Sequence, residues 1–319
     1  MKSLLWRPDA VLGGFEAATL SLPMAVDGPV TATLIRMRSR QPTGRVVLYL
    51  HGFIDYFFQA HMAQRYKELG YSFYALDLRR YGRSLQPGQR PNYCTDLSEY
   101  YADIDAAIEA IDSAENQPWL LLNGHSTGGL IGALYSHEGQ HRGRIGGLFL
   151  NSPFFDFNAT AAQRLSLRLA SAVGRFAPGI AIAGAISPLY AESVHSDYRG
   201  VWSFNTAWKP IAGFPTYTGW LRAIGSGQRR LQAGLQITCP ILLLHSARSA
   251  GGPTWHDEFA TSDIVLNIQH MQRYASGLGR EVRVVAITAG LHDLMLSTEP
   301  VRAQVFAELE AWLHTIKLC

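Results

Sequence analysis

The chain has 319 residues, of which 47% are hydrophobic and 17% charged, with a formal net charge of +3. That composition is typical of a globular protein, and the length allows one large domain with an insertion, or two domains. Lysine and arginine are scattered, which excludes the basic patch expected of a nucleic-acid-binding protein. Three cysteines, Cys94, Cys239 and Cys319, are too few and too far apart for a disulfide framework or a zinc site. They favour a reducing compartment.

The sequence lacks the usual signals for export or membrane insertion. Residues 1–9 have only a short apolar patch before charge and proline, unlike a signal peptide. No stretch approaches the roughly 18 apolar residues of a spanning helix. The most apolar long stretch, Ala177–Leu189, contains two prolines and two glycines. We therefore expect a cytoplasmic protein with no integral membrane segment, and a peripheral membrane contact stays open.

The first 150 residues alternate between strand-like and helix-like patterns. A hairpin of two outer strands comes first, with Asp27-Gly28-Pro29 as its turn. Continuous apolar runs then indicate strands buried on both faces. The predicted strands cover 15–22, 31–39, 45–50, 72–76, 119–122 and 147–150, and the predicted helices cover 59–69, 97–111 and 130–134. Asp96 is the expected cap of the second helix. Such alternation with short connections predicts a mainly parallel, doubly wound α/β sheet.

The alternation ends at Asn151-Ser152-Pro153. Residues 154–235 contain helical segments, clearest over 161–176, many aromatic side chains and no strand signal. The later predicted strands cover 240–245 and 282–287, and the later predicted helices cover 264–276 and 301–316. We therefore predict an α/β core formed by residues 1–153 and 236–319, with residues 154–235 inserted as a helical cap.

The segment Trp119–Gly129 has the pattern of an apolar strand, a turn of small residues and the start of a helix. Its turn contains Gly124-x-Ser126-x-Gly128, which is typical of a nucleophile elbow. A serine on so sharp a turn has a strained backbone, and the residues two positions away must be small. The Thr127 N–H, at the helix N-terminus, is a predicted donor to a developing oxyanion.

A serine nucleophile needs a histidine and a carboxylate, and in an open α/β sheet these follow the carboxyl ends of strands. Among 11 histidines, His292 is the candidate base because it follows the last predicted strand. The acid is less direct, because no carboxylate closely follows the strand at 241–245. We predict Asp263, with Asp257 as the alternative. Asp293 adjoins the histidine and cannot easily reach its ring.

A second oxyanion donor is expected after the strand that ends at Leu50. In His51-Gly52-Phe53, the glycine permits a tight turn and the Phe53 N–H is the predicted donor. We interpret His51 as a structural hydrogen-bonding residue. None of these groups requires a metal or an organic cofactor.

These segments together resemble an α/β-hydrolase, nearest to the monoacylglycerol lipase and lysophospholipase group that is labelled serine aminopeptidase S33. The matching motifs are Leu50-His51-Gly52-Phe53, Asp77-Leu78-Arg79-Arg80-Tyr81-Gly82-Arg83-Ser84, Gly124-His125-Ser126-Thr127-Gly128-Gly129, Asp263-Ile264-Val265 and Gly290-Leu291-His292. Two departures stand out. Arg80 replaces a glycine of the second motif. Ser249 occupies the usual place of the acid, and an insertion over about 249–262 would explain why the Asp-x-Val unit comes later.

The resemblance implies an α/β-hydrolase fold with a sheet of about eight strands and a helical cap. It implies a cofactor-free serine hydrolase that cleaves a small acyl ester, such as a monoacylglycerol or a lysophospholipid, through an acyl-enzyme. Three alternatives stay open: an aminopeptidase, a carbon–carbon bond hydrolase with the same triad, and a non-catalytic ligand-binding protein. An aminopeptidase should place carboxylates in the cap, where the candidates are Asp156, Glu192 and Asp197.

Overall fold

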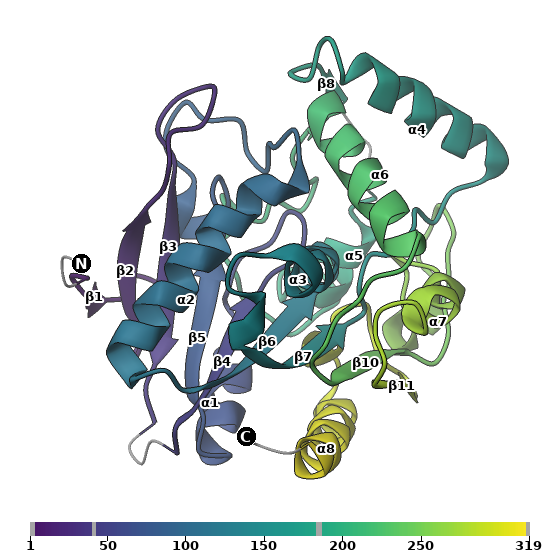
Figure 1. The fold of residues 1–319 in the computed structure, drawn as a ribbon. Coiled ribbons are helices and arrows are strands. Elements are labelled where there is room, and N and C mark those ends of the chain that lie inside the picture. Colours follow the sequence, from purple (N-terminus) through teal and green to yellow (C-terminus); the bar gives the residue numbers. More distant parts are fainter. Residues whose placement is uncertain (1–3, 40–42, 183–186, 317–319) are drawn as a thin grey trace.

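A central sheet of nine strands organises the computed structural model, which describes residues 4–39, 43–182 and 187–316 (Figure 1). Cys319 therefore lies outside the described residues. The strands are β1 (Arg7–Pro8), β2 (Glu16–Ser21), β3 (Thr31–Met37), β4 (Arg45–Leu50), β5 (Ser72–Asp77), β6 (Trp119–His125), β7 (Ile145–Asn151), β10 (Ile241–Ser246) and β11 (Val282–Ile287). Their order is β1-β2-β3-β5-β4-β6-β7-β10-β11. The ninth strand, relative to the expected eight, is the two-residue β1.

The strand directions confirm the predicted doubly wound α/β fold. Strands β2 and β3 form the predicted antiparallel hairpin, and β3 pairs antiparallel with β5. From β5 through β4, β6, β7 and β10 to β11, all neighbours are parallel. The carboxyl ends of β4, β6, β7, β10 and β11 therefore meet at one edge, where α/β proteins place their functional groups.

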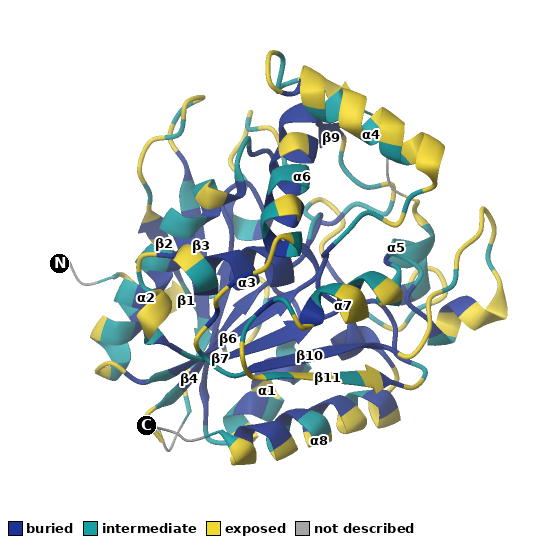
Figure 2. Ribbon diagram, turned by 45° about the vertical axis from the view of Figure 1, so that its right-hand side comes forward, coloured by how far each residue is buried: buried dark blue, intermediate teal, exposed yellow. Residues whose placement is uncertain are grey.

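Helices cover both faces of this sheet. Those of the α/β part are α1 (Ala60–Glu68), α2 (Tyr101–Glu115), α3 (Thr127–Glu138), α7 (Ile268–Ala275) and α8 (Glu299–Thr315). Helices α1 and α8 bury Met62, Tyr66 and Trp312 in the core on one face, and α2 and α3 bury Ile104 and Leu134 on the other. Asp96 caps the 3₁₀-helix Leu97–Tyr100, which leads into α2, because its carboxylate accepts from the Ser98 N–H. Sheet and helices thus form three layers, which Figure 2 shows as buried strands between half-exposed helices.

Between β7 and β10 the chain forms an insert of mostly helical structure. Its elements are α4 (Ala161–Val173), β8 (Ala181–Ile182), α5 (Leu189–Val194), β9 (Thr216–Tyr217) and α6 (Thr218–Gln232). The prediction of no strands here was wrong, because β8 and β9 pair antiparallel. Strands of two residues are too short to produce a detectable alternation. Among the described residues, none of the helices has the length and apolar character needed to cross a membrane.

Helix α7 begins at Ile268, four residues later than predicted. The Asp263 carboxylate oxygen Oδ1 accepts hydrogen bonds at 2.8 Å from the backbone N–H groups of Val265 and Leu266, which stabilises a turn. The Asn267 side chain then accepts from the Gln269 N–H and caps the helix. The apolar run after Asp263 is therefore a turn that leads into the helix.

Candidate active site

Ser126 lies at a strained turn between β6 and α3. Its backbone φ is +52° and ψ is −115°, a conformation that non-glycine residues rarely adopt. A Cβ at Gly124 would lie 2.6 Å from the Gly128 carbonyl oxygen, and one at Gly128 would lie 2.4 Å from the carbonyl oxygens of Leu50 and His51. Both flanking positions therefore require glycine, which is the steric reason for the sequence pattern.

His292 lies between Ser126 and Asp263. Its Nε2 is 3.0 Å from Ser126 Oγ, and its Nδ1 is 2.9 Å from Asp263 Oδ2. All three residues are buried. Since a carboxylate only accepts, Nδ1 carries the proton and Nε2 is left to accept the Ser126 hydroxyl proton. The structure thus brings these three predicted residues together in a geometry suited to activating the serine.

Asp263 reaches the site although it follows β10 at a distance. Its backbone N–H donates to the Arg248 carbonyl at 3.0 Å, and its carbonyl accepts from the Ala250 N–H at 3.0 Å. The chain therefore leaves the end of the strand after Ala250 and returns to it at Asp263. Asp257 is exposed in the 3₁₀-helix Asp257–Thr261 and forms no hydrogen bond with His292.

Two backbone N–H groups beside Ser126 are unused. Neither the Phe53 N–H nor the Thr127 N–H donates a hydrogen bond to any residue that the structure describes. The loop after β4 lies close to the elbow because position 52 is glycine: a Cβ there would be 3.2 Å from Ser126 Cβ and from the His125 ring. Both predicted donors are therefore free to bind an oxyanion.

His51 has its ring nitrogens occupied. Its Nδ1 is 2.8 Å from the Gly52 carbonyl, and its Nε2 accepts from the Leu78 N–H at 3.1 Å. Burial lowers the pKa of His51, so its ring is neutral near pH 7. His51 therefore links the loop after β4 to the loop after β5.

Arg80, at the position where the family motif has glycine, has a left-handed backbone with φ +64°. The side chain offsets this strain: it donates to the Tyr93 carbonyl at 2.7 Å and forms an ion pair with Asp27. Asp77 of the same motif accepts from the Phe57 N–H at 2.9 Å. The motif therefore supports the loop that carries Phe53, despite the substitution.

The sequence predicts no role for Asp293. In the structure its buried side chain joins several segments next to His292. Its carboxylate accepts from Asn151 Nδ2 at 2.8 Å, from Gln59 Nε2 at 3.1 Å and from the Met295 N–H. Burial acts to raise the pKa of Asp293, but His125 and the hydrogen bonds from Met295 and Asn151 hold it below the ordinary value. The only signal in the sequence is the position of this carboxylate directly after His292, the candidate base.

A mainly parallel sheet with a serine on a strained strand-to-helix turn, faced by a histidine, defines the α/β-hydrolase class. The family model described as serine aminopeptidase, S33, matches residues 41–250, which is more than half of the chain. The chain therefore belongs to this hydrolase family, and the prediction of a hydrolase is confirmed.

Three of the similar proteins are named as monoacylglycerol or monoglyceride lipases. The chain is 29% identical over 237 residues to a monoacylglycerol lipase of Mycolicibacterium smegmatis, covering 71% of this chain and 79% of the relative. A soluble variant of the monoglyceride lipase of Saccharomyces cerevisiae has a similar fold, with a TM-score of 0.66 and 17% identity over 94% of this chain and 96% of the other. The monoacylglycerol lipase of Paleococcus ferrophilus gives a TM-score of 0.64 and 21% identity, covering 89% and 99%.

Proposed function

We propose that this protein is a serine hydrolase of small carboxylic esters, with a monoacylglycerol, a lysophospholipid or a similar acyl ester as substrate. The observation that carries the proposal is the hydrogen-bonded series Asp263–His292–Ser126 beside two free backbone N–H groups. The names of the relatives support the substrate class.

In the proposed reaction, Ser126 Oγ attacks the ester carbonyl carbon while His292 Nε2 takes the hydroxyl proton. Asp263 stabilises the imidazolium, and the N–H groups of Phe53 and Thr127 stabilise the tetrahedral oxyanion. The intermediate then collapses, the bond to the alcohol oxygen breaks, and His292 protonates the leaving alkoxide. Water next attacks the acyl-enzyme, His292 takes its proton, and collapse releases the carboxylic acid while the proton returns to Ser126 Oγ.

The carboxylates of the insert favour an esterase over an aminopeptidase. Asp156 is paired with Arg164 at 3.0 Å, and Glu192 is paired with Arg199 at 3.2 Å. Asp197 is largely exposed, 3.7 Å from the buried ring of His195. Asp156 and Glu192 therefore already have arginine partners in the insert and are poor candidates for binding the free amine of a peptide substrate. The His195 nitrogen beside Asp197 instead accepts a hydrogen bond from the Asp197 N–H, so it is not a cationic partner of that carboxylate.

Labelling with a fluorophosphonate probe tests the proposed nucleophile. We expect wild-type protein to be labelled and Ser126→Ala to be unlabelled, because the probe reacts with an activated serine. Absence of Ser126-dependent labelling would overturn the hydrolase proposal and favour the ligand-binding alternative. A panel of p-nitrophenyl esters, monoacylglycerols and an aminoacyl amide then separates esterase from peptidase; preference for the amide would contradict the proposal.

The predicted acid is tested by assaying Asp263→Asn beside Asp257→Asn on a p-nitrophenyl ester. Loss of the carboxylate that orients the histidine should lower kcat by about 10³–10⁴-fold in Asp263→Asn. Asp257→Asn should keep the wild-type rate, because Asp257 is exposed and does not contact His292. The reverse pattern would make Asp257 the acid.

We also propose that helix α4 contacts a membrane surface peripherally. Leu165, Leu169 and Val173 form an exposed stripe along α4, and Phe176 and Ile180 continue it beyond the helix. Helix α4 contains arginines but no acidic residue, and Arg168 forms no ion pair with any described residue. Exposed apolar residues beside basic ones are typical of helices that lie in a lipid interface. A cytoplasmic location stays a prediction.

Flotation with phospholipid vesicles tests this contact. Wild-type protein should float with vesicles that contain anionic lipid, and a Leu165→Ser/Leu169→Ser variant should float several-fold less. A matched Val11→Ser variant changes an exposed apolar residue outside the insert and should bind as wild type. Equal flotation of all three proteins would contradict a membrane contact through α4.

A further inference from the structure

A buried ion pair joins the insert to the loop that carries Phe53. Lys209 Nζ lies 2.7 Å from Asp55 Oδ1, and the two residues are only 6% and 3% exposed. The rings of Phe58 and Phe204 lie 5.1 and 5.3 Å from the ammonium group and exclude water from it. A buried ion pair contributes little net stability, because desolvation offsets the Coulomb attraction. Its effect on geometry is therefore of more interest than its effect on stability.

Asp55 belongs to the loop after β4, and contacts with the sheet fix this loop only in part. It follows Phe53 by two residues, and Ile54 between them has φ +50°. Side chains in this loop are instead held by the insert: Phe53 stacks on Trp220 with ring centroids 3.9 Å apart, and the Tyr56 hydroxyl accepts from the Asn205 N–H at 2.7 Å. The Lys209–Asp55 pair is the only salt bridge among these contacts.

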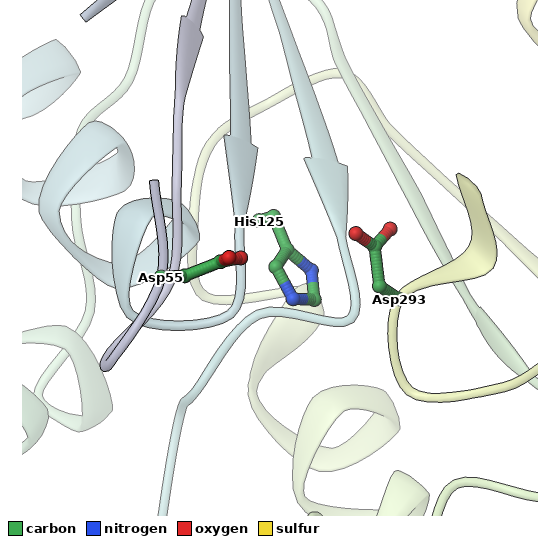
Figure 3. A group of neighbouring side chains, drawn as sticks. All are labelled: Asp55, His125 and Asp293. Atoms are coloured by element: carbon green, nitrogen blue, oxygen red, sulfur yellow. The ribbon is translucent and has the colours of Figure 1, made fainter. Parts of the chain in front are cut away.

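On its other side, Asp55 faces His125 and Asp293. Figure 3 shows the imidazole ring of His125 between the two carboxylates, and the polar atoms of the three residues lie within 4.8 Å of one another. His125 precedes the nucleophile and Asp293 follows the base. Such a group resembles a metal site, but the Lys209 ammonium already binds Asp55 and repels a second cation. Lys209 thus places its ammonium group on the side of Asp55 that faces away from His125 and Asp293.

We infer that Lys209 is a positioning residue for the oxyanion hole, an inference that rests on the proposed esterase function. It does not contact the reacting atoms. Through Asp55 it fixes the backbone after Phe53, so that the Phe53 N–H is directed at the same point as the Thr127 N–H. Without it, the loop loses the one salt bridge that it forms with the described residues, and the donor moves. Misplacement by about 1 Å can lower the rate by about 10²-fold, close to the loss on removing one donor.

The test is Lys209→Met, with Lys67→Met as a matched control. Lys67 lies on α1 and forms no ion pair with any described residue. On a soluble p-nitrophenyl ester, Lys209→Met should lower kcat by roughly 10²-fold with KM changed less than about threefold. Lys67→Met should keep the wild-type kcat. A folded Lys209→Met protein with wild-type kcat would overturn the inference.

A trifluoromethyl ketone distinguishes positioning from general structural damage. Ser126 Oγ adds to its carbonyl carbon, the hydroxyl proton moves to His292, and the carbonyl oxygen becomes an oxyanion. Affinity for this inhibitor should fall in parallel with kcat/KM in Lys209→Met, while affinity for a non-reacting ether analogue of the substrate stays unchanged. A parallel loss of both affinities would show that Lys209 supports the pocket as a whole, and would overturn the inference.

A second variant covers the case in which Lys209→Met does not fold. Lys209→Met/Asp55→Leu removes both charges, and apolar replacement of a whole buried ion pair usually preserves folding. It should retain the lowered kcat because the tether is still missing; a wild-type kcat would overturn the inference. Failure of the proposed function itself is separately visible, since wild-type protein would then show no Ser126-dependent labelling.

Discussion

Two parts of the insert differ sharply in how they contact the α/β core. The inner segment, residues 189–213, is bonded to the loop of His292 and to the loop of Phe53. The Tyr190 hydroxyl accepts from the Asp293 N–H at 3.0 Å, and the Asn205 N–H donates to the Tyr56 hydroxyl at 2.7 Å. Helix α4 has no buried residue and packs mainly on α6. Figure 2 shows α4 at the edge of the molecule, mostly exposed and in part of intermediate burial.

This difference indicates that the insert combines two roles. The inner segment is a structural part of the candidate site, since it fixes the loops of Phe53 and His292. The outer helix leaves its apolar side chains in water, at an energetic cost that only a partner surface would remove. Changes in the inner segment should therefore affect stability and catalysis, and changes in α4 should affect neither.

The largest loss of stability is expected from Trp202→Ala. The Trp202 ring stacks on His61 with centroids 4.4 Å apart and lies 5.1 Å from the Arg302 guanidinium. Because the residue is only partly buried, we expect the free energy of unfolding to fall by about 2–3 kcal/mol, below the range for a fully buried tryptophan. Urea denaturation measures this change.

Phe176→Ala is the control, because Phe176 is 85% exposed beyond α4. It should change the free energy of unfolding by less than about 0.5 kcal/mol. Equal effects of the two substitutions would remove the distinction between the inner and outer parts of the insert.

The core and the elbow were predictable from the sequence because local physics determines them. The run Arg45–Leu50 is strand β4 residue for residue, since a continuous apolar run between turn signals fits only a strand buried on both faces. The pattern around Ser126 identified the turn because a Cβ at either flanking glycine would collide with backbone atoms. His292 followed from its place after the last strand.

The contacts that complete the site could not be predicted, because they join distant segments without a motif. Lys209 and Asp55 are 154 residues apart, and nothing in the composition of residues 154–235 distinguishes Lys209 from a solvated lysine. The apolar residues after Asp263 have helical spacing and therefore predict a helix start at 264, where the structure has a turn. Only the hydrogen bonds to Val265 and Leu266 reveal the turn.

A smaller, pH-dependent loss is expected from Asp293→Asn, where the inner segment meets the His292 loop. The pKa of Asp293 lies below its ordinary value of 3.8, so its ionised form stabilises the fold above that pH. At pH 7 we expect the substitution to cost about 1–2 kcal/mol, from weaker hydrogen bonds to Asn151, Gln59 and Met295.

That contribution is lost as the pH falls from 3.8 through the lower pKa of the folded state. Urea denaturation of wild type and Asp293→Asn at several pH values should therefore give curves of stability that converge in acid. A difference that stays constant down to pH 3 would mean that the ionisation of Asp293 does not stabilise the fold.

The smallest effect is expected from Leu165→Ser/Leu169→Ser on α4. Both leucines are about 60% exposed, so their replacement removes little buried apolar area and should change the free energy of unfolding by less than about 0.5 kcal/mol. Hydrolysis of a soluble p-nitrophenyl ester should stay within twofold of wild type, because α4 contacts none of the proposed catalytic residues. If this variant instead lost activity on the soluble ester, α4 would have to be placed with the inner segment as a part of the site, and its exposed leucines would act on small substrates directly.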